Sequence, residues 1–297
     1  MTASPPIHIA LTFDDNFWAP AFATMRSVCL TTKRRKDLVF HLCHRTLAPE
    51  HKADFAKITA EFGSEVRYYD IDRMPMFASI ASRAAYNRRL SNIVYARLLF
   101  GTFIPEEVTR LTYLDCDMMV YAPIERIAEI DLQGHPIAAV NEPHSFHISM
   151  GRDMRLKNDL FDAADPYFNA GLIVIDIAGW RAANILEKLE TAIADGTMDR
   201  IYYDQDFLNL VFKNDWLELD QRWNMVDPRP IHQTLRPYLL HYTGAGKPWK
   251  RTANVAFLRA YRHVMTNELY NRYMLYRWRK KLTWPIREFS KLIGKNR

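Results

Sequence analysis

Strand-like and helix-like segments alternate along most of the chain. The strand-like segments are short apolar runs with many β-branched or aromatic residues, and they cover residues 7–13, 38–43, 65–71, 111–115, 136–140, 172–177 and 238–241. The helix-like segments between them cover residues 18–30, 49–62, 91–100, 179–194 and 202–212. Strands and helices that take turns along a chain form βαβ units. The pattern therefore predicts an α/β protein with a single Rossmann-like, mostly parallel central sheet flanked by helices.

Residues 144–166 interrupt this alternation. They are polar, show little periodicity, and are longer than most connections in compact domains. Long connections of this kind commonly carry function, so we expect a functional loop here.

The composition is that of an ordinary globular protein with a substantial core. The 297 residues are 48% hydrophobic and 25% charged, enough for one large domain or two modest ones. Cys29, Cys43 and Cys116 are scattered and odd in number, which favours reduced thiols in the cytoplasm over a disulfide framework. The first residues lack a basic segment followed by an apolar one, and no apolar run could span a bilayer. We therefore expect neither a secretory signal nor a membrane-spanning helix.

The charge is distributed unevenly along the chain. Residues 247–297 contain 14 Lys and Arg but two acidic residues, a local charge of +12, whereas the whole chain carries +6 and the remainder therefore −6. Tyrosines and tryptophans interleave with these basic residues, which suits the headgroup region of an anionic membrane. Single-stranded nucleic acid, or a solvated tail packed partly on the body, are the alternatives.

Two aspartates one residue apart end the apolar run at residues 111–115. Alternate residues of an extended chain point the same way, so Asp115 and Asp117 can face one point, where their charges need a cation between them. Carboxylate oxygens there suit Mg²⁺ or Mn²⁺, which in turn hold phosphate; an exposed turn that closes the strand is the alternative. Asp14 also ends a strand. Ligands of parallel sheets gather beyond the carboxyl ends of the strands, so this agreement favours a site.

Six short motifs give the chain a resemblance to a known family. They are Phe13-Asp14-Asp15-Asn16-Phe17, Tyr95-Ala96-Arg97, Leu114-Asp115-Cys116-Asp117, Tyr167-Phe168-Asn169-Ala170-Gly171, Asp204-Gln205-Asp206 and His241-Tyr242-Thr243-Gly244-Ala245-Gly246-Lys247-Pro248-Trp249. In their order and approximate spacing, over about residues 7–250, they resemble glycosyltransferase family 8. That family includes bacterial lipopolysaccharide galactosyl- and glucosyltransferases and the glycogenins.

The resemblance implies a GT-A catalytic domain at residues 1–250, to which we add a basic, aromatic-rich helical tail at residues 251–297. It implies retaining transfer of a hexose from UDP-galactose or UDP-glucose to a saccharide acceptor, with Mn²⁺ as cofactor and Mg²⁺ as the alternative ion. The bacterial relatives suggest synthesis of lipopolysaccharide or another surface glycan on a lipid-linked acceptor. We therefore expect a cytoplasmic enzyme held peripherally on the inner face of the membrane by its tail, with no nucleic-acid partner.

The resemblance also implies roles for individual residues. The metal ligands are Asp115, Asp117 and His241. Donor binding is implied for Thr12, Asp14, Asn16, Phe17, Arg97, Asp115, Cys116, Asp117, Asn169, Gly244 and Lys247. The catalytic candidates are Asp204, Gln205 and Asp206. Asn141 is expected on the acceptor side, at the end of a strand adjacent to the metal strand.

Several of these residues have structural alternatives. His241 could be a satisfied histidine at a strand end, and Arg97 could form an ion pair on a helix surface. Asp204 and Asp206 could stabilise the start of a helix through its dipole. Asn141 could form a turn before Pro143.

The residue types also bear on the mechanism. The resemblance places Gln205 beside the anomeric carbon, and an amide is a poor nucleophile. We therefore favour direct attack by the acceptor on the face that UDP leaves. A covalent intermediate on Asp204 or Asp206 is the alternative. No Lys-Ser/Thr pair follows the glycines at 244 and 246, which excludes an ATPase P-loop. A non-catalytic nucleotide-sugar or glycan-binding module on the same fold is the alternative function.

Overall fold

The computed structural model describes residues 4–84, 91–142, 160–162 and 165–294, with side chains of the last helix described as far as residue 282. The expected functional loop at residues 144–166 lies largely outside these ranges. Within them, no helix combines the length and the apolar character needed to cross a bilayer.

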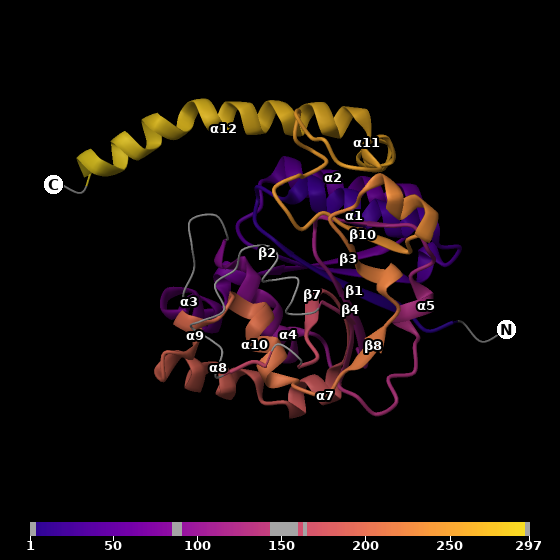
Figure 1. Ribbon diagram of the computed structural model, residues 1–297. Coiled ribbons are helices and arrows are strands. Elements are labelled where there is room, and N and C mark those ends of the chain that lie inside the picture. Colours follow the sequence, from indigo (N-terminus) through magenta and orange to yellow (C-terminus); the bar gives the residue numbers. More distant parts are fainter. Residues whose placement is uncertain (1–3, 85–90, 143–159, 163–164, 295–297) are drawn as a thin grey trace.

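A seven-stranded central sheet organises the fold (Figure 1), in the order β3-β2-β1-β4-β7-β6-β8. Its strands are β1 Ile7–Phe13, β2 Leu38–His44, β3 Glu65–Asp70, β4 Arg110–Leu114, β6 Ile137–Asn141, β7 Phe168–Asp176 and β8 Leu217–Leu219. β1 pairs in parallel with β2 and β4, β2 with β3, and β6 with β8, whereas β7 runs antiparallel to both of its neighbours. The predicted mostly parallel sheet is confirmed. A smaller sheet contains β5 Met118–Val120, β10 Leu239–His241 and β9 Met225–Val226.

Helices cover both faces of the central sheet. One face, uppermost in Figure 1, carries α1 Trp18–Thr31, α2 Pro49–Phe62, α11 Leu258–Met265 and α12 Asn267–Gly294. The other face carries α3 Pro75–Arg83, α4 Phe100–Phe103, α7 Ile177–Ala182, α8 Ile185–Ala194, α9 Thr197–Arg200 and α10 Tyr203–Val211. The remaining described helices are α5 Glu125–Ala128 and the 3₁₀ segments η1 Arg35–Asp37, η2 Ile71–Arg73, η3 Asn92–Leu99, η5 Gln221–Asn224 and η6 Pro230–Leu235.

The alternation of side chains along the strands separates two hydrophobic cores. Ile9 and Leu11 of β1 belong to the core under α1 and α2, whereas Ala10 between them belongs to the core on the opposite face. Each core is therefore assembled from one face of the sheet and the helices that cover it.

Two expected elements differ in the structure. The single helix expected at residues 179–194 is divided, because Asn184 has a left-handed backbone with φ of 50° and ends α7 before α8 begins. The expected strand at 172–177 begins earlier, at Phe168, so that the motif glycine Gly171 lies within β7.

The first part of the C-terminal segment packs on the body. Tyr261, Met265, Leu269 and Tyr273 are at most 4% exposed and belong to the core under α1. Arg272 adds an ion pair with the buried carboxylate of Asp54 on α2. The predicted boundary at residue 250 therefore does not coincide with a break in packing.

Candidate active site

The carboxyl ends of β1 and β4 define one edge of the sheet, where the two strands run parallel as neighbours. A cavity of about 400 Å³ lies at this edge. It is lined by ten of the eleven residues expected to bind the donor, namely Thr12, Asp14, Phe17, Arg97, Asp115, Cys116, Asp117, Asn169, Gly244 and Lys247. Asp204, Gln205 and His241 also line it, so that all six motifs contribute to one cavity.

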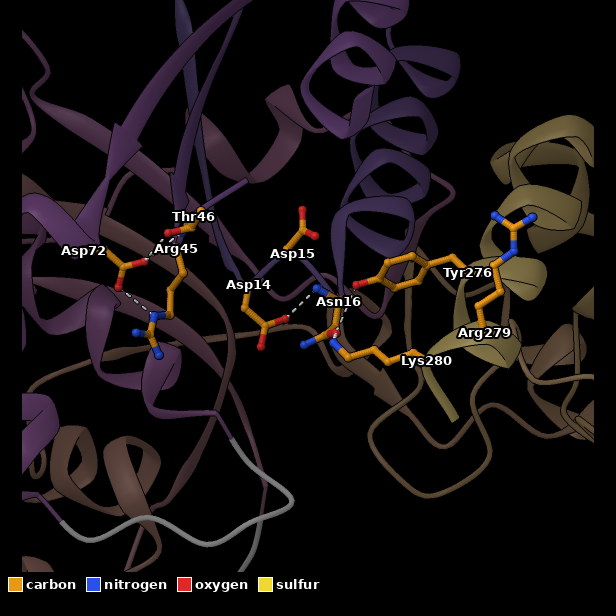
Figure 2. A pocket seen from close by; sticks show the side chains of 9 residues that line it. All are labelled: Asp14, Asp15, Asn16, Arg45, Thr46, Asp72, Tyr276, Arg279 and Lys280. Carbon is orange, nitrogen blue, oxygen red and sulfur yellow. Dashed lines mark hydrogen bonds and ion pairs between the residues drawn. The ribbon is translucent and has the colours of Figure 1, made fainter. Parts of the chain in front are cut away.

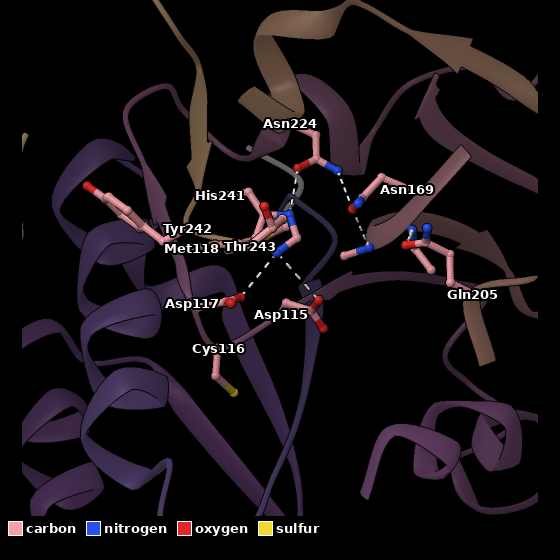
Figure 3. Close-up of polar contacts among 12 residues, drawn as sticks. Asp115, Cys116, Asp117, Met118, Asn169, Gln205, Asn224, His241, Tyr242 and Thr243 are labelled. Atoms are coloured by element: carbon pink, nitrogen blue, oxygen red, sulfur yellow. Dashed lines mark hydrogen bonds and ion pairs between the residues drawn. The ribbon is translucent and has the colours of Figure 1, made fainter. Parts of the chain in front are cut away.

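Asp115, Asp117 and His241 form a compact cluster (Figure 3), with one ligand atom from each lying within 4.8 Å of the others. His241 reaches the aspartates because β10 pairs with β5, which directly follows Asp117. Nε2 of His241 lies 3.2 Å from Asp117 Oδ1 and 3.6 Å from Asp115 Oδ2. Two carboxylates and an imidazole nitrogen suit Mn²⁺ or Mg²⁺ better than a soft metal.

Lys247 supplies positive charge beside the same cluster. Its Nζ lies 2.5 Å from Asp117 Oδ2 and also donates to the backbone oxygen of Tyr242. Burial tends to raise the pKa of Asp117, but the positive charge of Lys247 and the proximity of the His241 ring outweigh it and hold that pKa well below its ordinary value. Asp117 is therefore ionised, as a metal ligand must be.

Arg97 connects this cluster to α10. Its side chain is buried, and it lies 3.2 Å from Asp115 Oδ1 and 2.8 Å from Asp204 Oδ2, the latter as an ion pair without hydrogen-bond geometry. Its guanidinium also donates to the backbone oxygen of Ala170 at 2.5 Å. The alternative interpretation of Arg97 as part of a helix-surface ion pair is therefore wrong.

The two aspartates of the Asp204-Gln205-Asp206 motif have different environments. Asp204 lines the cavity, and burial, with a smaller contribution from Asp115 and against the effect of Arg97, raises its pKa to about 6. Asp206 is fully buried and does not line the cavity; its carboxylate accepts hydrogen bonds from the Tyr167 hydroxyl and from the Tyr202 backbone N–H. The position of Asp206 thus agrees with the alternative of a residue that stabilises the start of α10.

Gln205 is held on both sides of its amide. Its Oε1 accepts a 3.1 Å bond from the Ala170 N–H, and its Nε2 donates to Glu142 Oε2 at 2.9 Å and to the Tyr167 hydroxyl at 3.1 Å. Glu142 Oε2 also accepts a 3.1 Å bond from Asn169. These contacts fix the amide at the wall of the cavity.

The expectation for Asn141 needs a correction. Its strand, β6, is not adjacent to the metal strand β4, because β7 lies between them. The cavity is lined by the next residue, Glu142, rather than by Asn141. The pairing of β6 with β7 shifts register between Ala139 and Val140, and such a bulge changes which side chains face the site. That shift could not be read from the sequence.

Asn16 was expected to bind the donor sugar nucleotide, but it does not line the cavity of about 400 Å³ described above. It lines an adjoining cavity of about 600 Å³ together with Asp14 and residues of α12 (Figure 2). Its side-chain oxygen accepts hydrogen bonds from Tyr276 and Lys280, and its backbone oxygen accepts one from Tyr273 at 2.7 Å. The loop after β1 is thus held by the C-terminal helix, which the sequence motifs did not predict.

Two further residues of the site were not expected from the sequence. Tyr113 lines the cavity, and its hydroxyl donates a 2.5 Å bond to Asp115 Oδ1. Asn224, at the end of η5, contacts His241 Nδ1 through its side-chain oxygen at 2.9 Å. Tyr113 lies in the metal strand, two residues before Asp115, so strand alternation could have indicated it.

A family model and several known proteins match most of the chain. The model of glycosyl transferase family 8 matches residues 8–253. General stress protein A of Bacillus subtilis is 24% identical over 283 residues, 89% of this chain and 95% of that protein. Probable galacturonosyltransferase-like 3 of Arabidopsis thaliana is 30% identical over 273 residues, 82% of this chain and 75% of that protein.

Solved structures show the same architecture. The galactosyltransferase LgtC, solved in complex with donor and acceptor sugar analogues, superposes with a TM-score of 0.70 at 23% identity, over 87% of this chain and 95% of LgtC. This likeness confirms the predicted GT-A fold. Because the family model spans most of the chain and every one of its six motifs contributes to the site or its surroundings, the chain belongs to glycosyltransferase family 8.

Proposed function

We propose that the protein is a retaining hexosyltransferase, which moves galactose or glucose from UDP-galactose or UDP-glucose to a saccharide acceptor. The observation that carries this proposal is that the Asp115, Asp117 and His241 cluster and the Asp204–Gln205 end of α10 line one cavity of about 400 Å³. A UDP-sugar with its diphosphate at the cluster would direct its hexose toward α10. The volume lies within the range of about 300–1,000 Å³ typical of small-molecule sites.

The diphosphate end of the cavity suits a negatively charged leaving group. Mn²⁺, or Mg²⁺ as the alternative ion, would supply Lewis-acid stabilisation of the departing UDP. Lys247 and Arg97 place fixed positive charge beside the two aspartates. Gly244 has no side chain and lets the backbone approach a phosphate closely.

The sugar end of the cavity suits recognition and retention. Asp204 would accept hydrogen bonds from hydroxyls of the hexose, and the amide of Asn169 could either donate or accept them. Gln205 is a poor nucleophile, and Asp206 is buried and engaged through both carboxylate oxygens. These constraints favour attack on the face that UDP leaves, through an oxocarbenium-like state, with the leaving phosphate helping to deprotonate the acceptor. Asp204 and Glu142 are the carboxylates left for a covalent route.

The proposed acceptor is a lipid-linked saccharide, in the synthesis of lipopolysaccharide or another surface glycan. The proposed location is the inner face of the membrane, contacted through α12. Trp278, which is 60% exposed, and the basic residues around it support this location.

Incubation with a panel of UDP-sugars and Mn²⁺, read by mass spectrometry, tests the proposal. We expect hydrolysis or transfer with UDP-galactose or UDP-glucose. Gln205→Ala should reduce turnover far more than UDP affinity, because UDP lacks the hexose, whereas the exposed control Gln233→Ala should change neither. A protein that binds these UDP-sugars with Mn²⁺ but turns none of them over would instead be the non-catalytic binding module.

A further inference from the structure

Asn224 is a buried asparagine that bridges the metal cluster and the wall of the sugar end. It is 4% exposed and lies at the end of η5 (Figure 3). Its Oδ1 lies 2.9 Å from His241 Nδ1, and its Nδ2 lies 2.9 Å from Asn169 Oδ1. Asn224 does not itself line the cavity, so any effect on the reaction must pass through these two neighbours.

The orientation of Asn169 follows from a backbone group. The Gly171 N–H can only donate, and it lies 2.9 Å from Asn169 Oδ1, so this atom must be the carbonyl oxygen of the amide. The other end of the same amide lies 3.1 Å from Glu142 Oε2, where a carboxylate requires a donor. Both contacts therefore select the same orientation.

The orientation of Asn169 determines that of Asn224, and in turn the proton of His241. Because Asn169 presents an oxygen, Asn224 must present its NH₂ group to it. The carbonyl oxygen of Asn224 then faces His241 Nδ1, and an oxygen needs an N–H there. The neutral ring carries one proton, so Nε2 is left with its lone pair directed at Asp115 and Asp117.

We infer that Asn224 is a positioning residue that holds His241 in its Nδ1–H tautomer, and that Asn169 and the Gly171 N–H fix the orientation of Asn224. This inference rests on the metal site of the proposed function. Without Asn224, the imidazole proton has a competing place on Nε2, where it would donate to Asp117 Oδ1 at 3.2 Å. A proton at that atom blocks the lone pair needed for a divalent cation.

The tautomer is measured directly by nitrogen-15 NMR of histidine-labelled, metal-free protein, with spectra recorded as a function of pH so that the signals of the neutral ring are identified. The His241 signals are assigned with His241→Gln. We expect the Nδ1–H form in the unsubstituted protein and a shift to the Nε2–H form in Asn224→Leu. Asn224→Asp should retain the Nδ1–H form, because a carboxyl oxygen still accepts from Nδ1. Asn169→Leu should also shift His241 toward the Nε2–H form, although Asn169 makes no hydrogen bond to His241, because the orientation of Asn224 is then no longer fixed.

The affinity for Mn²⁺ provides the second readout. It is measured from the electron paramagnetic resonance signal of the free ion. Loss of a hydrogen-bond partner behind a metal-bound histidine typically weakens metal binding about 10- to 100-fold, and we expect this loss for Asn224→Leu and recovery for Asn224→Asp. Asn209→Ala is the matched control, since Asn209 is equally buried but bonds to the backbone of Phe168 and Gln205. It should leave the tautomer and Mn²⁺ affinity unchanged.

Two results would overturn the inference: an Nε2–H tautomer in the unsubstituted protein, or unchanged tautomer and Mn²⁺ affinity in Asn224→Leu. If Asn224→Leu does not fold, the unsubstituted protein and Asn224→Asp decide between the tautomers. Because the tautomer is read without metal or donor, a failure to transfer hexose leaves this measurement unaffected. The two proposals can therefore fail separately.

Discussion

The guanidinium Nε of Arg97 lies 2.8 Å from Oδ2 of Asp204, and both side chains are almost fully buried. The same guanidinium lies 3.2 Å from Asp115 Oδ1. One buried cation thus balances a carboxylate of the metal motif and a carboxylate of the proposed sugar-binding helix. Arg97 couples the charge states of the two ends of the cavity.

The pH dependence of stability should report on Asp204, whose pKa burial raises to about 6. Because this native pKa exceeds that of the unfolded chain, the native state binds the proton more tightly. The stabilising contribution is full below about pH 4 and is lost as the pH rises through about 6. The free energy of unfolding should therefore fall between about pH 4 and pH 6, and we expect Asp204→Asn to reduce this fall.

Urea unfolding of the metal-free protein across that range measures this effect. Asp199→Asn, at an exposed position on α9, is the control and should leave the pH profile unchanged. Parallel profiles for Asp204→Asn and the unsubstituted protein would contradict the raised pKa of Asp204.

The metal site predicts that UDP stabilises the protein only in the presence of Mn²⁺. At about 100 times its dissociation constant, a ligand stabilises the native state by about 2.7 kcal/mol. This stabilisation should disappear in Asp117→Asn, which removes a charged ligand atom, and should persist in Asp199→Asn. Thermal unfolding with UDP, with and without Mn²⁺, measures it. Equal stabilisation by UDP in both conditions would remove the metal assignment.

The convergence of the motifs could be predicted from the sequence because it depends on regular elements. Asp14 and Asp115 each end a strand, and the alternation of strands and helices places parallel strand ends at one edge. The pairing of β1 with β4 brings the two residues together there. The apolar pattern of the strands therefore predicts that Asp14 and Asp115 lie at one edge, whereas the roles of the other motif residues rest on the family resemblance.

The missed residues depend on irregular structure and on contacts distant in sequence. Glu142 enters the cavity after a register shift in β6, and Asn224 lies on a 3₁₀ turn that has no periodic signal. Asn16 was expected at the donor site, but its contact with Tyr273 of α12 joins residues 257 positions apart and was not. Such positions follow from tertiary packing rather than from local pattern.

Gly171 is a sensitive point of the metal site. A Cβ there would overlap Cε1 of His241 and lie 2.9 Å from both His241 Nδ1 and Asn169 Oδ1. We expect Gly171→Ala to displace His241, weaken Mn²⁺ binding by about tenfold or more, and lower the free energy of unfolding by about 1–3 kcal/mol. The electron paramagnetic resonance of free Mn²⁺ measures the change in binding, and urea unfolding measures the change in the free energy of unfolding.

Gly101→Ala is the matched control, because its nearest neighbour is the flexible side chain of Arg181 at 3.3 Å. It should leave Mn²⁺ binding unchanged. Full Mn²⁺ affinity in a folded Gly171→Ala variant would show that His241 is not a ligand.

The last prediction concerns the exposed face of α12. Leu275, Trp278 and Leu282 are 46%, 60% and 55% exposed and follow helical spacing, so they share one side of the helix. Leu269 and Tyr273, which are buried against the body, lie on the opposite side. Arg272 and Lys280 contact Asp54 and Asn16 of the body. The exposed Arg279 and Lys281 are the described basic residues that flank the outward apolar side, an arrangement similar to that of helices that lie on anionic membranes. We expect the full chain to bind anionic phospholipid vesicles, and high salt to weaken this binding.

Replacement of surface residues is a sharper test than removal of the whole segment, because truncation before Met265 would also remove buried core residues. Trp278→Ala with Leu282→Ala should weaken vesicle sedimentation at least tenfold, since each large apolar side chain contributes about 1.5 kcal/mol or more when buried. UDP-sugar hydrolysis should remain, because neither residue lines the described cavities at the donor site. Ile231→Ala with Leu235→Ala, exposed apolar residues on η6, is the control and should sediment like the unsubstituted protein. Equal sedimentation of both double variants would show that this side of α12 does not contact the membrane.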